Sequence, residues 1–165
     1  MSELVAGRTK GEQSWGTPQS LFDELYREFF FTLDVCASEW NTKLPLYFSE
    51  QENGLLRSWA GERCFCNPPF KQIRKWLEKG LLEVATNLVP SVFLLPANVG
   101  TRWFHEIALP FGEVHLFKGR IAFDAPPGQV DLKRPSFSPM LVILDPESTT
   151  FGVTKTRCAK TGRVL

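Results

Sequence analysis

The chain has 165 residues and a mass of 18.7 kDa, which fits one domain of ordinary size and is too short for two full ones. Hydrophobic residues make up 43% and charged residues 22%, as in folded globular proteins and unlike disordered chains. A net charge of +1 excludes a strongly basic nucleic-acid coat protein, while it allows a local basic groove.

Neither a membrane segment nor a metal site is predicted. No apolar run approaches the roughly 18 residues of a transmembrane helix, and the polar N-terminal residues lack the apolar core of a signal peptide. We therefore expect an intracellular protein whose four cysteines are structural thiols. We expect Cys64 and Cys66 to point to opposite faces of one strand, where they could not share a metal ion. With only two histidines, the chain offers few other zinc ligands.

The first third of the chain predicts an arm, a helix and a strand. Residues 1–14 are polar and are expected to form a flexible arm before the folded domain. Thr17-Pro18 then predicts a helix start, with Thr17 as the cap and Pro18 in the first helical position. Apolar residues follow at helical spacing: Leu21, Phe22, Leu25 and Phe29. Residues 31–36 alternate between apolar and polar, which predicts a strand, and residues 38–62 are expected to be irregular apart from a short strand at 46–48.

The rest of the chain alternates between expected strands and expected helices. Strands are predicted at 63–66, 91–95, 113–117, 121–123 and 140–144, and helices at 71–85 and 101–109. A long loop with four prolines, at 125–139, and a weakly patterned tail, at 147–165, complete the chain. The tail is expected to be a hairpin or disordered, so that the folded domain spans residues 15–146.

This alternation predicts an α/β fold, a mostly parallel sheet with helices on both faces. Ligands of such sheets bind at the carboxyl ends of the strands. The candidate site residues are therefore those that follow the predicted strands, at 34–38, 67–70, 96–100 and 118–120.

Asn67-Pro68-Pro69-Phe70 directly follows a short hydrophobic strand and is the most informative stretch. The carboxamide of Asn67 offers an oxygen acceptor, and the two prolines stiffen the turn, so that the Pro68 carbonyl is a second acceptor at a fixed place. Phe70 adds a flat ring. This set suits a planar group that carries an amine, such as adenine, because accepting both amine N–H bonds frees the nitrogen lone pair for attack. The alternative is that Asn67 caps the following helix, and the residues alone leave both interpretations open.

An ordered set of motifs extends this signal over residues 14–145. The set consists of Trp15-Gly16-Thr17-Pro18, Leu21-Phe22, Leu33-Asp34-Val35-Cys36-Ala37, Asn53-Gly54-Leu55, Trp59, Cys66-Asn67-Pro68-Pro69-Phe70 and Gly119-Arg120-Ile121-Ala122-Phe123. In this order the motifs resemble the phage-type DNA N6-adenine methyltransferase family, whose members use S-adenosylmethionine. The resemblance implies a Rossmann-like fold and methyl transfer to the N6 amine of adenine in DNA, in the cytoplasm of a bacterial host.

The resemblance also implies roles for individual residues. Asn67, Pro68, Pro69 and Phe70 would form the catalytic turn that holds the target base. The cofactor would lie against Trp15, Thr17, Pro18, Asp34, Cys36, Ala37 and Asn53. For Asp34 the alternative is an acid that caps the end of a strand, for Trp15 a core contact, and for Asn53 a solvated turn. The loop that follows Asp34 departs from the family, because Cys36-Ala37-Ser38-Glu39-Trp40 has no glycine where related enzymes carry a glycine-rich loop.

The expected partner is DNA, and the alternatives differ in what the site accepts. Lys118, Arg120, Lys133 and Arg134 are expected to contact DNA phosphates, with surface ion pairs or a solvated face as the alternative. An adenine in a duplex would have to flip out of the stack to reach the turn. An RNA base or a protein side-chain amide would also suit the turn, since each presents a planar amine. The glycine-poor loop favours a further alternative, a nucleic-acid-binding module of the same fold without catalysis.

Overall fold

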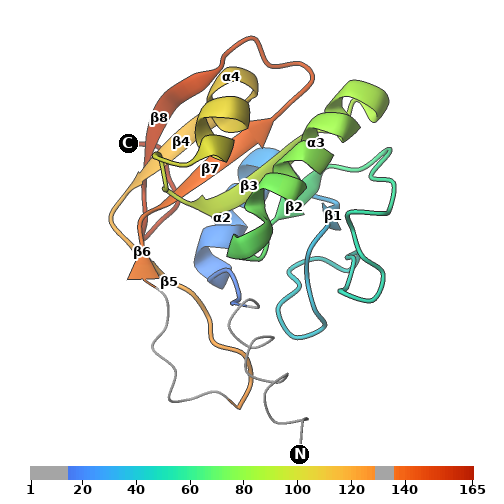
Figure 1. The fold of residues 1–165 in the computed structure, drawn as a ribbon. Coiled ribbons are helices and arrows are strands. Elements are labelled where there is room, and N and C mark those ends of the chain that lie inside the picture. The colour runs from blue at the N-terminus through green and yellow to red at the C-terminus, as the bar shows by residue number, and fades with distance from the viewer. Residues whose placement is uncertain (1–14, 129–135) are drawn as a thin grey trace, which may run out of the picture.

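The computed structural model describes residues 15–128 and 136–165. Its main sheet has six strands in the order β1-β2-β3-β7-β4-β8 (Figure 1). These strands are β1 (Leu33–Asp34), β2 (Cys64–Cys66), β3 (Ser91–Pro96), β7 (Pro139–Leu144), β4 (Glu113–Lys118) and β8 (Gly152–Cys158). β7 runs antiparallel to both of its neighbours, whereas every other adjacent pair is parallel. A second, antiparallel sheet joins β5 (Ile121–Ala122) to β6 (Ser136–Phe137).

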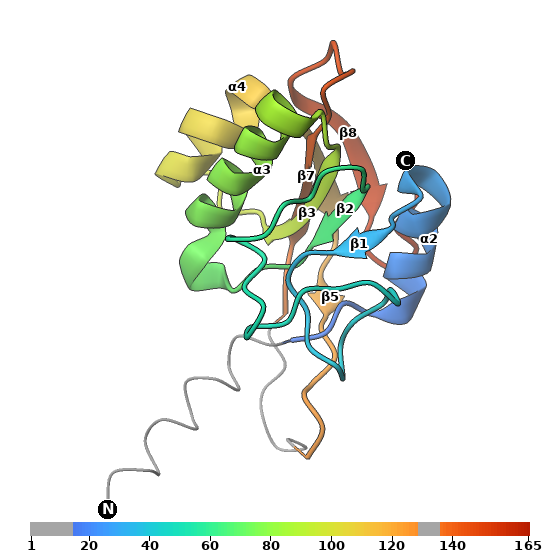
Figure 2. The ribbon, with the colours of Figure 1, turned by 90° about the vertical axis from the view of Figure 1, so that its right-hand side faces the viewer.

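Helices cover both faces of the main sheet (Figure 2). α2 (Gln19–Phe29) lies on one face, and α3 (Ile73–Asn87) lies on the other with η2 (Phe104–Ala108) and α4 (Leu109–Phe111). A 3-10 turn, η1 (Phe70–Gln72), leads into α3. The predicted α/β architecture, a mostly parallel sheet with helices on both faces, is confirmed.

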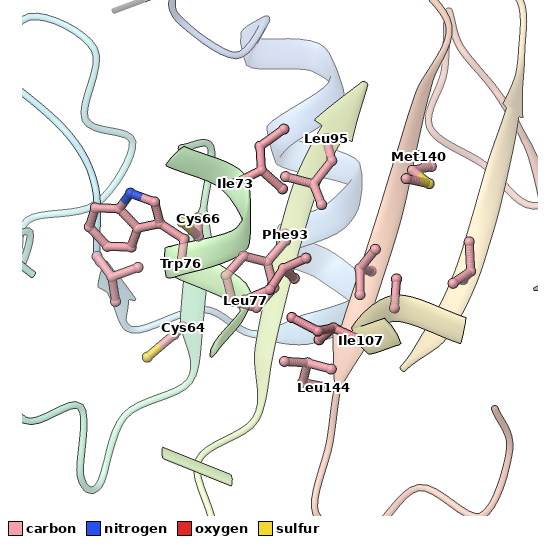
Figure 3. Packing of buried hydrophobic residues seen from close by; sticks show 14 of the residues in the cluster. Cys64, Cys66, Ile73, Trp76, Leu77, Phe93, Leu95, Ile107, Met140 and Leu144 are labelled. Atoms are coloured by element: carbon pink, nitrogen blue, oxygen red, sulfur yellow. The ribbon is translucent and has the colours of Figure 1, made fainter. Parts of the chain in front are cut away.

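Each face of the sheet has its own hydrophobic core, because side chains alternate along a strand. The core under α3 is shown in Figure 3 and includes Cys64, Cys66, Ile73, Trp76, Leu77, Phe93, Leu95, Ile107, Met140 and Leu144. The core under α2 includes Leu21, Phe22, Leu25, Phe65, Leu94 and Leu141. The central strands β2, β3 and β7 supply both cores, so they are buried on both sides, as their continuous apolar runs predict.

The prediction that Cys64 and Cys66 face opposite ways is wrong. Both thiols lie in the core under α3 (Figure 3). Phe65 between them belongs to the core under α2. Residues two apart in a strand share a face, because the side-chain period is two. Burial raises the pKa of both thiols, which keeps them protonated among apolar neighbours, the environment of structural cysteines.

β1 is shorter than the strand predicted at 31–36, since only two residues pair with β2. On the other side of β1, the backbone N–H of Asp34 donates to the Leu46 carbonyl at 3.1 Å. The Phe48 N–H donates in turn to the Asp34 carbonyl at 2.9 Å. The short strand expected at 46–48 is therefore a single bridge, and it holds this segment against the end of β1.

The helix expected at 101–109 is less regular than predicted, and the loop expected at 125–139 is more regular. The helix expected at 101–109 contains a π-helical turn, η2, followed by the short α4, in which Pro110 has no N–H to donate. The loop expected at 125–139 ends in β6, which pairs with β5. Residues 129–135 of that loop lie outside the described residues.

The C-terminal residues are part of the main sheet. β8 pairs in parallel with β4, so the expectation of a disordered segment is wrong for residues 152–158. The hairpin alternative holds at the end of β8, where Arg157 and Val164 form an antiparallel bridge. The weak sequence pattern has a physical cause. Within β8 the one buried side chain is the charged Arg157, so the apolar alternation that predicts a strand is missing.

Arg157 joins β8 to α2, β4 and the C-terminal turn. Its side chain is fully buried, and Nε donates to His115 Nδ1 at 2.8 Å, while Nη1 donates to the Gly162 carbonyl at 2.9 Å. Nη2 reaches both carboxylate oxygens of Glu28 at 2.7 Å. Because Nδ1 of His115 accepts, the ring must carry its proton on Nε2, which donates to Glu113 at 2.8 Å. Burial lowers the pKa of His115, so the neutral form that this network requires is favoured.

Arg157→Leu should therefore lower the free energy of unfolding by about 3 kcal/mol, since it removes one partner of a buried charged network. Urea denaturation measures this loss. Arg27→Gln is the matched control, because Arg27 is 70% exposed and pairs only with Glu24, three residues away, so little change is expected. An Arg157→Leu protein as stable as the wild type would contradict this role.

Candidate active site

A cleft of about 680 Å³ opens at the carboxyl ends of β1 and β2. Its walls come from the loop after β1, from residues 48–55 and from the turn and first helical residues after β2. Among the residues named from the sequence, the cleft is lined by Trp15, Cys36, Ala37, Asn53, Asn67 and Pro69. The volume lies in the range of small-molecule binding pockets.

The Asn67–Phe70 turn begins where β2 ends, and it does not cap a helix with its asparagine. Pro69 precedes the 3-10 turn η1, which has no side-chain cap, and the Pro69 carbonyl accepts from the Gln72 N–H at 2.9 Å. The interpretation of Asn67 as a helix cap is therefore wrong. Pro68 is buried, and no described residue donates to its carbonyl oxygen, which stays available as an acceptor.

The carboxamide of Asn67 is held by the segment that precedes α2. Its Nδ2 donates to the Trp15 carbonyl at 3.1 Å and contacts the Thr17 hydroxyl oxygen at 3.2 Å. A carbonyl can only accept, so the amide nitrogen must face Trp15 and the orientation of the amide is settled chemically. No described residue donates to Oδ1 of Asn67, which leaves this oxygen as a free acceptor on a residue of the cleft.

Thr17 and Pro18 differ from their predicted roles at the start of the helix. α2 has no side-chain cap, and Pro18 occupies the cap position itself, before the first helical residue. Thr17 is buried and uses its hydroxyl oxygen as an acceptor for Asn67. Pro18 is not among the residues that line the cleft, and its carbonyl accepts from the Phe22 N–H at 3.0 Å.

Phe70 lies apart from the other residues of the turn. It is 36% exposed, it is absent from the lining of the cleft, and its ring meets Phe123 and Phe137 edge to face at centroid distances of 6.4 and 5.1 Å. These two neighbours belong to the segment after β5 and to β6. The aromatic face predicted for the turn is thus present, but it stands beside the second sheet.

Asp34 ends β1 next to the cleft and is almost fully buried. It lines a small crevice together with Thr17, and this crevice shares Trp15, Cys36 and Asn67 with the cleft. Its Oδ1 accepts from the Cys36 N–H at 3.4 Å. Burial outweighs this bond and raises the pKa of Asp34 to about 7. The carboxyl group therefore titrates near neutral pH at the edge of the cleft.

Val35 and Ser38 also line the cleft and lie in the range 34–38 that the sequence predicts for the site. The sequence assigned no role to the other lining residues, which are Asn41, Phe48, Ser49, Glu50, Gly54, Leu55, Gln72, Lys75 and Trp76. The sequence could have predicted Gln72, Lys75 and Trp76 as site residues, because their spacing places them on one helix face directly after the turn. The glycine at position 54 was a second signal in the sequence. The structure gives the reason for it, because a side chain there would collide with the Val35 carbonyl oxygen and only glycine allows this close approach.

Two polar atoms at the cleft have no partner among residues 15–128 and 136–165. They are the Ser38 hydroxyl and the Trp76 indole nitrogen, which are buried without a hydrogen bond to these residues, and both residues line the cleft. Buried polar groups without partners are uncommon in folded proteins and need an explanation. Asn53 also lines the cleft, in a left-handed backbone conformation with φ of 54°, and its Oδ1 accepts from Leu55 at 3.3 Å.

Two of the four residues predicted to contact DNA can be placed. Lys118 ends β4 and Arg120 precedes β5, and both side chains are exposed. β4 runs parallel to β2, so Lys118 and Arg120 follow a strand at the same edge of the sheet as the turn. Lys133 and Arg134 lie outside the described residues.

Residues 15–128 and 136–165 contain no group of three His, Cys, Asp or Glu side chains arranged to hold a metal ion. No helix within these ranges combines the length and apolar character needed to cross a membrane.

Comparison with known proteins agrees with the motifs. A curated protein of Haemophilus phage HP1 (strain HP1c1), named DNA N-6-adenine-methyltransferase, is 28% identical over 137 residues, which cover 81% of this chain and 79% of that protein. A protein of the same name from Escherichia phage T1 is 30% identical over 113 residues, 63% of this chain and 47% of that protein. The profile of the DNA N-6-adenine-methyltransferase (Dam) family matches residues 7–162. The resemblance predicted from the sequence is confirmed, and this chain belongs to the DNA N-6-adenine-methyltransferase family.

Proposed function

We propose that this protein transfers a methyl group from S-adenosylmethionine to the N6 amine of a flipped-out adenine in DNA. The cleft would bind the cofactor, and the Asn67–Phe70 turn would hold the base. The observation that supports this assignment most directly is the Asn67 carboxamide. Both of its N–H bonds point to the segment before α2, which leaves Oδ1 as an acceptor at the cleft.

The residues of the cleft fit S-adenosylmethionine. The cofactor combines a nucleoside, which carries hydrogen-bond acceptors, with a cationic sulfonium centre. The buried donors of Ser38 and Trp76 lack partners and would be satisfied by such acceptors. The carboxyl of Asp34 would favour its ionised form beside a cation.

The turn can activate an adenine amine by accepting its hydrogen bonds. The lone pair of the exocyclic nitrogen is delocalised into the ring, so the amine is a weak nucleophile. Asn67 Oδ1 and the Pro68 carbonyl would accept its two N–H bonds and free the lone pair, an electrostatic preorganisation. The bound cofactor would supply a methyl group activated by its positive sulfur. The methyl–sulfur bond would break as the methyl–nitrogen bond forms, which leaves a neutral thioether, and the nitrogen would then lose one of its two protons to solvent.

The DNA would approach at the edge of the sheet that carries the cleft. Lys118 and Arg120 are exposed there, and we propose that they contact backbone phosphates, as we do for Lys133 and Arg134. Phe70 directly follows Pro69, which lines the cleft, and is 36% exposed, so we propose that its ring stacks on an extruded base. The phage relatives support a site of action in the cytoplasm of a bacterial host.

Asn67→Ala should lower kcat for DNA methylation roughly 100- to 1,000-fold, because one preorganised acceptor is lost. Its affinity for S-adenosylmethionine should change little, as calorimetry would show. Asn87→Ala is the matched control, because Asn87 lies at the far end of α3 and its side chain donates to Glu83 in the same helix. Labelled methyl should enter DNA, and not RNA or protein. A nearly fully active Asn67→Ala protein, or wild-type protein that does not bind the cofactor, would refute the proposal.

Phe70→Ala should raise KM for DNA roughly tenfold, the value of one stacked base, and should leave cofactor affinity unchanged. Steady-state kinetics on a short adenine-containing duplex measures this. Phe111→Ala is the control, since Phe111 in α4 is 53% exposed and outside the lining of the cleft. If KM stays at the wild-type value, Phe70 only packs against the second sheet.

Asp34→Asn should stabilise the protein above neutral pH. Burial raises the pKa of Asp34 from 3.8 to about 7, so between these values the folded protein keeps a proton that the unfolded chain releases. Stability therefore falls as pH rises through this window, and the whole penalty remains above pH 7. At about 1.4 kcal/mol per pKa unit, removing the charge should raise the free energy of unfolding by at most about 4 kcal/mol.

Urea denaturation near pH 8 and near pH 4.5 measures the difference between Asp34→Asn and the wild type. The gain should be large at the higher pH and small at the lower one, where Asp34 is protonated in the folded protein. Equal differences at both pH values would show that the buried carboxyl group carries no such penalty.

A further inference from the structure

We propose that Thr17 is a positioning residue for the catalytic amide: its hydroxyl oxygen holds Nδ2 of Asn67 so that Oδ1 faces the adenine amine. The proposal rests on the proposed function and extends it. The sequence resemblance places Thr17 at the cofactor, whereas the structure bonds its hydroxyl to the catalytic turn.

The geometry gives each N–H of the Asn67 amide an acceptor. One is the Trp15 carbonyl at 3.1 Å, and the other is the Thr17 hydroxyl oxygen at 3.2 Å. The Trp15 carbonyl fixes which end of the amide faces this segment, and the Thr17 hydroxyl, as a second acceptor, fixes the angle of the amide plane about the Cβ–Cγ bond. Thr17 is 3% exposed, so water does not readily replace its hydroxyl.

The segment that carries these acceptors is itself fixed from the other side. Gly16 pairs with Asp124 through two backbone hydrogen bonds, of 2.9 and 2.8 Å. A side chain at Gly16 would crowd the Cβ atom of Asp124 and the ring of Trp40, each at 3.3 Å, so these two side chains pack closely against the segment. Residues 15–17 therefore form a short strap between the catalytic turn and the segment after β5. A fixed strap can hold an amide orientation that a mobile loop could not.

The orientation of the amide decides whether Asn67 can act at all. With Oδ1 toward the base, the amide accepts from the N6 amine and frees its lone pair. A flipped amide would present N–H bonds to an amine that also donates, and the contact would become repulsive. The hydroxyl of Thr17 can accept, but the methyl group of valine at the same place cannot. The loss should therefore appear in the chemical step and not in the binding of the cofactor.

The experiment compares Thr17→Val with Thr17→Ser, and each with the wild type. Thr17→Val should lower kcat about tenfold, the value of one neutral hydrogen bond, with affinity for S-adenosylmethionine within about twofold by calorimetry. Thr17→Ser keeps the hydroxyl and should recover most of kcat. Combined with Asn67→Ala, Thr17→Val should cause no further loss, since the amide that it positions is absent. Thr86→Val is the matched control, because the Thr86 hydroxyl bonds only within α3.

Two outcomes would overturn the positioning role. A Thr17→Val protein with normal kcat and weakened cofactor affinity would make Thr17 a cofactor contact. Full additivity with Asn67→Ala would show that the two side chains act independently. Wild-type protein that methylates no DNA would instead remove the proposed function, and the positioning role with it.

A measurement on the wild-type protein tests the contact without any substitution. In NMR spectra, both side-chain N–H protons of Asn67 should exchange slowly with solvent, because both are hydrogen-bonded next to a buried residue. Fast exchange of these protons would overturn the proposal even if Thr17→Val failed to fold.

Discussion

The two hydrogen bonds from Nδ2 of Asn67 to residues 15–17 are the contact on which the candidate site depends. They tie the turn after β2 to a segment about 50 residues earlier in the chain. Without them the turn would still be stiff, since Pro68 and Pro69 restrict its backbone. The amide of Asn67, however, would have no preferred orientation. The prolines place the side chain, and the strap decides which of its atoms meets the substrate.

The fold was largely predictable, because its strands bury both faces and carry continuous apolar runs. β3 and β7 are examples, as each is fully buried along its length. β8 was not predictable from periodicity, since Arg157 takes the place of an apolar residue and is satisfied by partners from α2 and β4. A buried charge with long-range partners leaves no local pattern, so only the folded structure reveals it.

The site was predictable where a strand end carries unusual chemistry and unpredictable where distant segments meet. Asn67 and Asp34 follow strands, and the rule for α/β sheets finds them. Phe48 and Glu50 line the cleft because their segment folds back beside β1, which no spacing in the sequence indicates. The hydroxyl of Thr17 shows why sequence prediction fails there. Local capping preferences predict that it caps α2, whereas in the folded structure it accepts a hydrogen bond from Asn67.

Buried polar groups that lack hydrogen-bond partners gather at the cleft and not in the structural network around Arg157. Arg157 is buried and charged, yet each of its three guanidinium nitrogens has an acceptor, as expected of a structural element. The residues at the cleft are different: Asp34 is buried with a raised pKa, and Ser38 and Trp76 keep polar atoms without partners. Of the three buried side-chain atoms that lack a partner within the described residues, two belong to residues of this cleft. Such costs are tolerated where a ligand relieves them, and their concentration beside Asn67 is an argument for cofactor binding that is independent of any motif.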